Sequence, residues 1–266
     1  MNALIALLLT ALLGGLAGSG TAEKAVAGKL RESFQARSVQ VEISRGHRSP
    51  FSKTLDRIEV DMAGFRSQGS GEELVFEPGK PLMAGRVGRL QVRASDFEAG
   101  GLPVREMRLT MVNLRYDLWK AMLKRRLKLL GFDRQGSTLS VTLTGPGLER
   151  FLRPRVTELT DLRLVLEEGR LTVTGKARVA LLPVPIRLSG RLEPMAGAIF
   201  LRDPALAVSV VPVPGFVTER IMTQINPLVD LNQGLQSPLR LFLRQISVHP
   251  SGLTLQADIS AKRSNN

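Results

Sequence analysis

Apolar residues occupy every second position along much of this chain, most clearly between residues 162 and 193. Leu162, Leu164 and Leu166 show this two-residue period, and it resumes after the Glu168-Gly169 turn and continues to Leu192. Successive side chains of a β-strand point to opposite faces of a sheet. The segment therefore predicts a β-meander with one apolar face and one polar face rich in arginine and lysine.

The same period recurs elsewhere, so the sequence predicts about ten one-sided strands. Besides the meander, the clearest segments are 39–43, 58–62, 90–94, 107–111, 139–143, 206–210, 239–243 and 253–259. None reads as the continuous apolar run typical of a parallel sheet, which is buried on both faces. We therefore expect an α+β, β-rich fold in which pairing is mainly antiparallel.

Helical spacing of apolar residues is rarer. It predicts amphipathic helices within 23–37, 116–132, 147–161 and 215–231, with Pro154 breaking the third and Pro227 ending or bending the fourth. The order of one helix followed by strands occurs twice, from residue 23 and again from about residue 147. This rhythm predicts a single domain, 23–266, made of two pseudo-repeated halves, 23–145 and 146–266.

Residues 1–22 form an apolar leader without charged side chains, and Gly20-Thr21-Ala22 fits a small-residue cleavage site. The leader is typical of a secretory signal peptide. The alternative is an uncleaved membrane anchor, because residues 3–20 are uncharged and just long enough to span a bilayer. Both interpretations predict export to the periplasm or cell envelope.

The charge balance favours a polyanionic partner. The chain carries a net charge of +13 and contains no cysteine, which excludes disulfides and thiolate chemistry. Nucleic acid, an anionic membrane and an acidic glycan all fit that charge. A nucleic-acid partner is not expected, because the chain has an export leader and only one Trp and one Tyr to stack on bases.

Residues suited to catalysis are sparse. His47 and His249 lie far apart in loop or strand-end contexts, and neither has a carboxylate at metal-ligand spacing. The adjacent carboxylates at 72–73 and 167–168 point apart along a strand or turn and are expected to be solvated. We therefore expect no enzyme activity, no cofactor and no metal.

The predicted helix at 116–132 is the strongest candidate site. Its apolar stripe and flanking basic residues match the pattern of a helix that lies in a lipid interface. The alternative is a helix that packs on the core and happens to have a basic outer face. The candidate lipid- or membrane-contacting residues are Trp119, Lys120, Met122, Leu123, Lys124, Arg125, Arg126 and Lys128.

Several segments together resemble the LmeA family of phospholipid-binding bacterial envelope proteins. They are "VQVEIS", "LDRIEVDMAGFR", "VREMRLTMVNLRYDL", "GSTLSVTLTGPGLERFL", "LEEGRLTVTGKARV" and "LRQISVHPSGLTLQADIS". The resemblance implies an elongated fold similar to tubular lipid-binding modules, in which a curved sheet wraps a few helices and leaves an apolar groove. It also implies binding of anionic phospholipid and a supporting role in envelope lipid or glycolipid assembly or transfer.

The predicted strands offer more apolar surface than four modest helices can cover, which favours a lipid guest. Two alternatives remain open. The first is an envelope scaffold that uses its basic surface to bind a protein or glycan. The second is an enzyme acting on envelope glycolipids, which would need a polar cluster assembled from distant segments.

Overall fold

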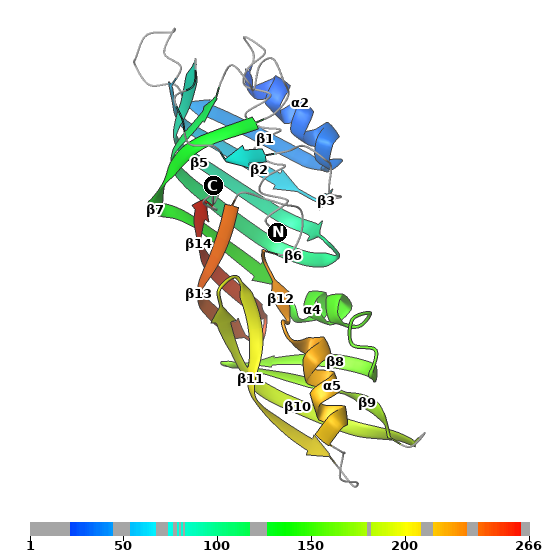
Figure 1. Ribbon diagram of the computed structural model, residues 1–266. Helices are drawn as coiled ribbons and strands as arrows, with labels where there is room; N and C mark the ends of the chain where they lie inside the picture. The colour runs from blue at the N-terminus through cyan, green and yellow to red at the C-terminus, as the bar shows by residue number, and fades with distance from the viewer. Residues whose placement is uncertain are drawn as a thin grey trace.

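The computed structural model describes residues 22–44, 54–67, 74–76, 79, 81, 83–117, 127–179, 182–208, 215–232 and 239–261. Within these residues the protein forms two β-sheets and three helices. The molecule is elongated, with the larger sheet at one end and the smaller sheet at the other (Figure 1). The prediction of a β-rich α+β fold is confirmed.

The larger sheet has nine strands in the order β1-β2-β5-β6-β7-β14-β13, with β3 paired to β5 and β4 paired to β7. The strands are β1 (Ser38–Ser44), β2 (Thr54–Ala63), β3 (Arg66–Ser67), β4 (Leu74–Phe76), β5 (Ala84–Ala99), β6 (Leu102–Asp117), β7 (Leu127–Leu143), β13 (Leu239–His249) and β14 (Gly252–Ala261). Most pairs are antiparallel as expected, but β2 and β3 run parallel to β5, and β4 runs parallel to β7.

The smaller sheet has five strands in the order β12-β11-β10-β9-β8, and all its pairs are antiparallel. The strands are β8 (Leu159–Glu167), β9 (Arg170–Val179), β10 (Leu182–Met195), β11 (Ala198–Val208) and β12 (Val229–Asp230). β8, β9 and β10 are the meander that the alternating leucines predict. The turn at Gly169 has φ of +71°, a conformation that glycine adopts without steric cost.

Three of the four predicted helices form at the expected places. They are α2 (Ala22–Phe34), α4 (Gly145–Leu152) and α5 (Gly215–Ile225). The α4 helix ends at Leu152, before Pro154, and the chain continues as a turn rather than as helix to residue 161. The Thr144 side chain caps this helix by accepting a hydrogen bond from the N–H of Gly147 at 3.1 Å.

The predicted helix at 116–132 is wrong at both ends. β6 extends to Asp117, and residues 127–132 belong to β7, where Leu129 pairs with Tyr116. Leu127, Lys128 and Leu129 also pair with the three residues of β4. Pairing with strands on two sides outweighs the local helical spacing of these leucines. Residues 118–126 lie outside the described part of the chain.

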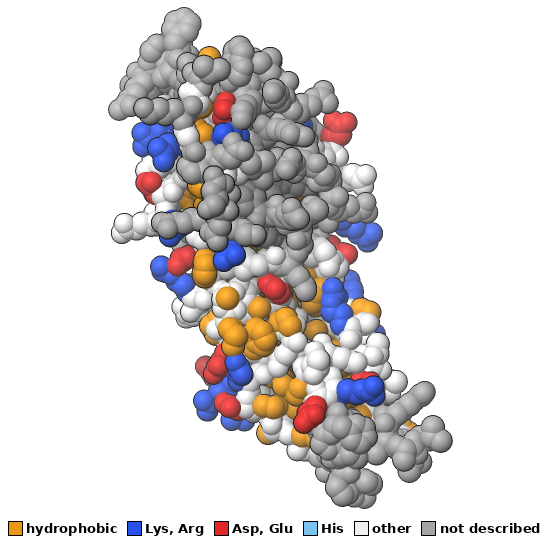
Figure 2. Space-filling model, in the orientation of Figure 1, with side chains coloured by type: hydrophobic (Ala, Val, Ile, Leu, Met, Phe, Trp, Pro, Cys, Tyr) orange, Lys and Arg blue, Asp and Glu red, His pale blue; other side chains and the backbone are white. Residues whose placement is uncertain are grey.

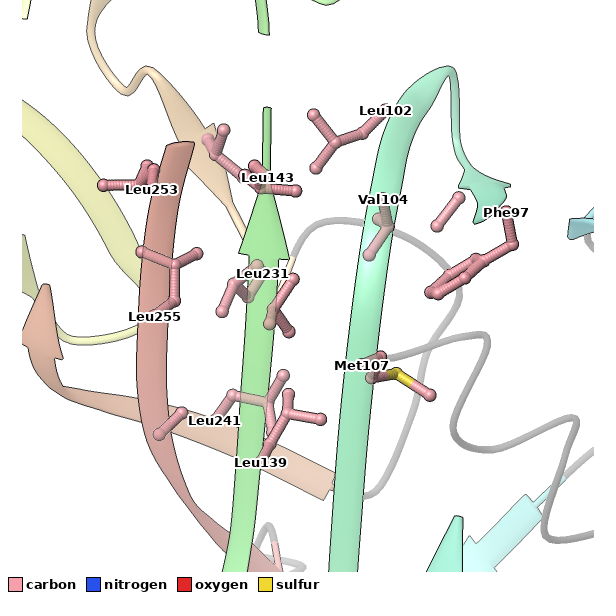
Figure 3. Close-up of a cluster of buried hydrophobic side chains, with 14 of the residues drawn as sticks. Phe97, Leu102, Val104, Met107, Leu139, Leu143, Leu231, Leu241, Leu253 and Leu255 are labelled. Carbon is pink, nitrogen blue, oxygen red and sulfur yellow. The ribbon is translucent and has the colours of Figure 1, made fainter. Parts of the chain in front are cut away.

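The two sheets share one apolar core. Leu143, Leu253 and Leu255 of the larger sheet lie with Leu231 in this core, and Leu241 of β13 lies beside them (Figure 3). β13 is the last strand of its sheet, and its outer edge is bonded to the other sheet's loops. The N–H of Leu243 donates to the carbonyl of Ala196 at 2.8 Å. The Asn232 side chain bonds both backbone groups of Leu241.

β13 and β14 come from the predicted second half of the chain but join the larger sheet. The division into two pseudo-repeated halves stays a prediction. Among the described elements, α2 contacts β1 of the larger sheet and α4 contacts β6.

Candidate functional site

The inward face of the larger sheet is apolar and buried. On the central strands it consists of Leu90, Val92, Ala94, Met107, Leu109, Leu139, Val141, Leu255 and Ala257, none more than 3% exposed. These side chains form part of the apolar core of the protein.

A cleft of about 860 Å³ opens at one end of this sheet. It lies between the end of α2, the turn joining β2 to β3, the neighbouring ends of β5 and β6, and the first turns of α4. Sites for small organic ligands typically measure about 300–1,000 Å³. A second hollow, beside Phe76 and Phe132, measures about 290 Å³ and is at the lower limit of that range.

The floor of the cleft is a row of three phenylalanines. The rings of Phe65 and Phe97 are stacked, with centroids 4.7 Å apart, and the ring of Phe34 meets Phe65 edge-on at 5.4 Å. All three side chains are at most 4% exposed, and Val104 continues the apolar floor beside Phe97 (Figure 3). Because the rings belong to α2, the β2–β3 turn and β5, the row holds three elements together.

The turn that positions Phe65 depends on Gly64. Gly64 has φ of +63°, and a Cβ added there would lie 3.1 Å from the Cβ of Arg37. Its N–H donates to the carbonyl of Ser95 at 3.1 Å, and the N–H of Glu98 donates to the carbonyl of Phe65 at 3.0 Å. These bonds fix the turn against β5, so the phenylalanine enters the cleft floor.

The pairing of β5 with β6 is interrupted at one position where the cleft begins. Ser95 pairs with Glu106 and Phe97 pairs with Val104, which leaves Asp96 and Arg105 between the two pairs. Asp96 has φ of 49°, a left-handed conformation that aspartate tolerates better than most residues. This left-handed residue interrupts the regular strand conformation of β5 at the cleft. Asp96 and Arg105 both line the cleft.

Charged side chains surround the mouth of the cleft. Arg66, Arg105 and Arg150 line it together with Asp96 and Glu98. Arg66 and Glu98 form an ion pair at 3.9 Å, and the Arg66 side chain is 78% exposed. Figure 2 shows basic side chains gathered over α4, the helix that carries Arg150. The cleft is therefore amphipathic, with an aromatic floor and a charged mouth.

The described residues show no arrangement typical of metal chemistry. Across them, no three His, Asp or Glu side chains gather closely enough to hold a metal ion. His249 is exposed at the end of β13. No helix in the described part of the chain is both long and apolar enough to cross a membrane.

Most of the predicted site residues lie outside the described part of the chain. These are Trp119, Lys120, Met122, Leu123, Lys124, Arg125 and Arg126. Lys128 is described, and it lies half-buried in β7, opposite Val75 of β4, rather than on a helix. A lipid-contacting role for this set stays a prediction. His47 and residues 1–21, with the predicted leader, also lie outside the described residues.

The cleft itself is not predicted by the sequence. Gly64, Phe65 and Arg66 occur in the segment "LDRIEVDMAGFR", which carries part of the family resemblance, but no local signal assigns them to a site. Arg105 belongs to β6 and Arg150 belongs to α4, 45 positions later in the sequence. Only the paired strands and the packing of α4 bring them to one mouth.

An amphipathic cleft at the end of a largely one-sided sheet is suited to a molecule with an apolar part and a polar part. Residues 78–258, about two-thirds of the chain, match the family described as LmeA-like phospholipid-binding. The chain belongs to this family of lipid-binding proteins, which confirms the resemblance. A search among curated proteins gives no match. The matched residues include β5, β6 and α4, which form one side of the cleft.

Proposed function

We propose that the protein binds one phospholipid in the cleft at the ends of β5 and β6. An acyl chain lies over the phenylalanine floor, and the headgroup stays at the charged mouth. The bound lipid is anionic, and the protein acts outside the cytoplasm, in the cell envelope, where it supports the assembly or transfer of lipids or glycolipids. Membership of a phospholipid-binding family supports the choice of ligand.

The phenylalanine floor below a charged mouth is the observation that carries this proposal. Each methylene of an acyl chain that leaves water contributes about 0.8 kcal/mol. Methylenes that lie against the floor therefore favour binding, before the costs of ordering the lipid. A polar headgroup left at the mouth keeps its water and its ionic partners, so burial of the chain is not offset by burial of charge.

Filling the cleft tests the proposal. Ser33 is exposed on the last turn of α2 and lines the cleft, so Ser33→Trp places a large side chain in the space proposed for lipid. Gly28 lies on the same helix, and a Cβ added there meets no atom within 4 Å. Gly28→Trp is therefore the matched control, since it adds the same side chain without entering the cleft.

The purified full-length proteins are extracted with organic solvent, and the extract is quantified by mass spectrometry. The wild type and Gly28→Trp are expected to carry phospholipid, and Ser33→Trp is expected to carry much less at unchanged thermal stability. Equal lipid in all three proteins would contradict the placement in this cleft. Wild-type protein free of lipid, and unable to take up short-chain phosphatidylglycerol, would favour the scaffold function instead.

Docking on a membrane surface is a separate part of the proposal. The basic residues at 120–128 are proposed to contact an anionic leaflet, where each Lys or Arg contributes about 1 kcal/mol. Lys124→Glu combined with Arg125→Glu is expected to weaken binding to phosphatidylglycerol vesicles, most strongly at low salt. Unaltered vesicle binding by this variant would contradict the docking, whatever the result for the cleft.

A further inference from the structure

We propose that Arg105 and Arg150 form the phosphate-binding pair of this cleft and make it selective for lipids that carry a phosphodiester. This inference rests on the proposed function and adds to it the two side chains that recognise the headgroup. It depends on which of the charges at the mouth are already neutralised within the protein.

The acidic groups near the two arginines are mostly occupied by other partners. Glu98 pairs with Arg66 at 3.9 Å, and Glu106 pairs with Arg108 at 2.6 Å. Glu149 of α4 pairs with Arg153 at 2.7 Å and also accepts a hydrogen bond from the N–H of Leu164 at 3.2 Å. These carboxylates are therefore committed to other groups.

Arg105 and Arg150 themselves form no ion pair or side-chain hydrogen bond with any described residue. Asp96 also lines the mouth and has no ion pair within the described part of the chain. Among the described residues at the mouth, two guanidinium groups and one carboxylate have no ion pair, which is an excess of one positive charge. A phosphodiester, with a single negative charge, matches that excess.

The two arginines lie on elements that pack against each other, Arg105 on β6 and Arg150 on α4. A Cβ added to Gly147 of α4 would lie 3.3 Å from the carbonyl oxygen of Pro103, so the helix backbone packs directly on the start of β6. Arg150 follows Gly147 by three residues, which places it on an adjacent part of the helix surface. Arg105 follows Pro103 by two residues, near the start of β6. Both side chains reach the same cleft.

Arginine suits this role because its planar guanidinium group donates two parallel hydrogen bonds to phosphate oxygens. The aromatic floor lies directly behind the mouth, so a phosphate held there leaves its acyl chain over Phe65 and Phe97. A neutral lipid makes the same apolar contacts but leaves the two arginines without an anion. The pair therefore sets preference between lipids of equal chain length.

The test compares the wild type with the double variant Arg105→Gln and Arg150→Gln. The control is the double variant Arg89→Gln and Arg93→Gln, which removes the same charge from exposed positions of β5 outside the cleft. Binding of short-chain phosphatidylglycerol, diacylglycerol of the same chain length, and inorganic phosphate is measured by calorimetry below micelle-forming concentrations. Thermal unfolding checks that all three proteins are folded.

The wild type and the Arg89/Arg93 control are expected to prefer phosphatidylglycerol over diacylglycerol by about tenfold or more, the effect of one charge-assisted hydrogen bond. The Arg105/Arg150 variant is expected to lose this preference and to bind diacylglycerol as the wild type does. A preserved preference in that variant would overturn the inference while leaving lipid binding in place. Inorganic phosphate binding as tightly as the lipid would also overturn it, because the site would then be a free-anion site. Wild-type protein that binds neither lipid would refute the proposed function as well.

Discussion

Replacement of Asn232 by alanine is expected to destabilise the junction between the two sheets. The Asn232 side chain accepts a hydrogen bond from the N–H of Leu241 at 2.9 Å and donates one to the carbonyl of the same residue at 3.0 Å. Both backbone groups lie on the outer edge of β13, where no further strand is paired in the described sheet. The alanine variant leaves them without these partners.

The magnitude follows from the two lost bonds. A buried backbone group left unsatisfied costs about 1–3 kcal/mol, and Leu241 is only 1% exposed. Because water entering the site recovers part of this cost, the expected loss is about 2–4 kcal/mol in the free energy of unfolding. In a protein of this size, 1 kcal/mol corresponds to about 2–4 °C, so the melting temperature should fall by roughly 5–15 °C.

The assay is thermal unfolding followed by circular dichroism, together with urea titration. Gln245→Ala is the matched control, because Gln245 is exposed on β13, the strand of Leu241, and its side-chain amide has no hydrogen bond in the described part of the chain. It is expected to change the melting temperature by less than about 2 °C. A melting temperature for Asn232→Ala that matches the Gln245→Ala value would refute the reasoning.

Three further substitutions are expected to change the stability of the protein. Burial raises the pKa of Tyr116 to about 12. The neutral phenol therefore stabilises the folded protein below about pH 10, and this stability is lost as the pH rises to about 12. In urea titrations across that range, Tyr116→Phe should remove about 2–3 kcal/mol of the fall in the free energy of unfolding. Gly252→Ala should destabilise by more than about 1 kcal/mol, because its Cβ would lie 2.4 Å from the backbone oxygen of Leu143; an unchanged urea midpoint would contradict this. Thr144→Ala should cost about 1 kcal/mol through loss of the α4 cap, with Thr144→Ser restoring most of it.

The strand content of the protein follows from local patterns. Alternation predicts the meander of β8, β9 and β10, and it predicts the central segments of β5, β6, β7 and β14. It succeeds because the side-chain period of a strand is a property of the strand itself. Pro154 and Pro227 also act locally, and α4 and α5 both end before them.

The segment at 127–132 shows where local patterns fail. Its leucines fit a helical stripe as well as a strand, and the sequence offers no means of choosing between them. The choice is made by β4 and β6, which pair with the segment from two sides. The left-handed conformations of Asp96 and Asn113 are similarly hidden, because the pairing of the strands around these residues decides them.

The sequence by itself determined that the protein is made of one-sided strands with few helices. The reason is that the alternation of apolar and polar residues is a local property of each segment. It also carried the family resemblance, through segments spread along the chain. Only the tertiary structure decided that β2 lies beside β5 and that β14 lies between β7 and β13. It also decided that Phe65 and Phe97 stack below a mouth with Arg105 and Arg150. These features depend on contacts between residues far apart in the chain, and on which charges the folded protein has already paired.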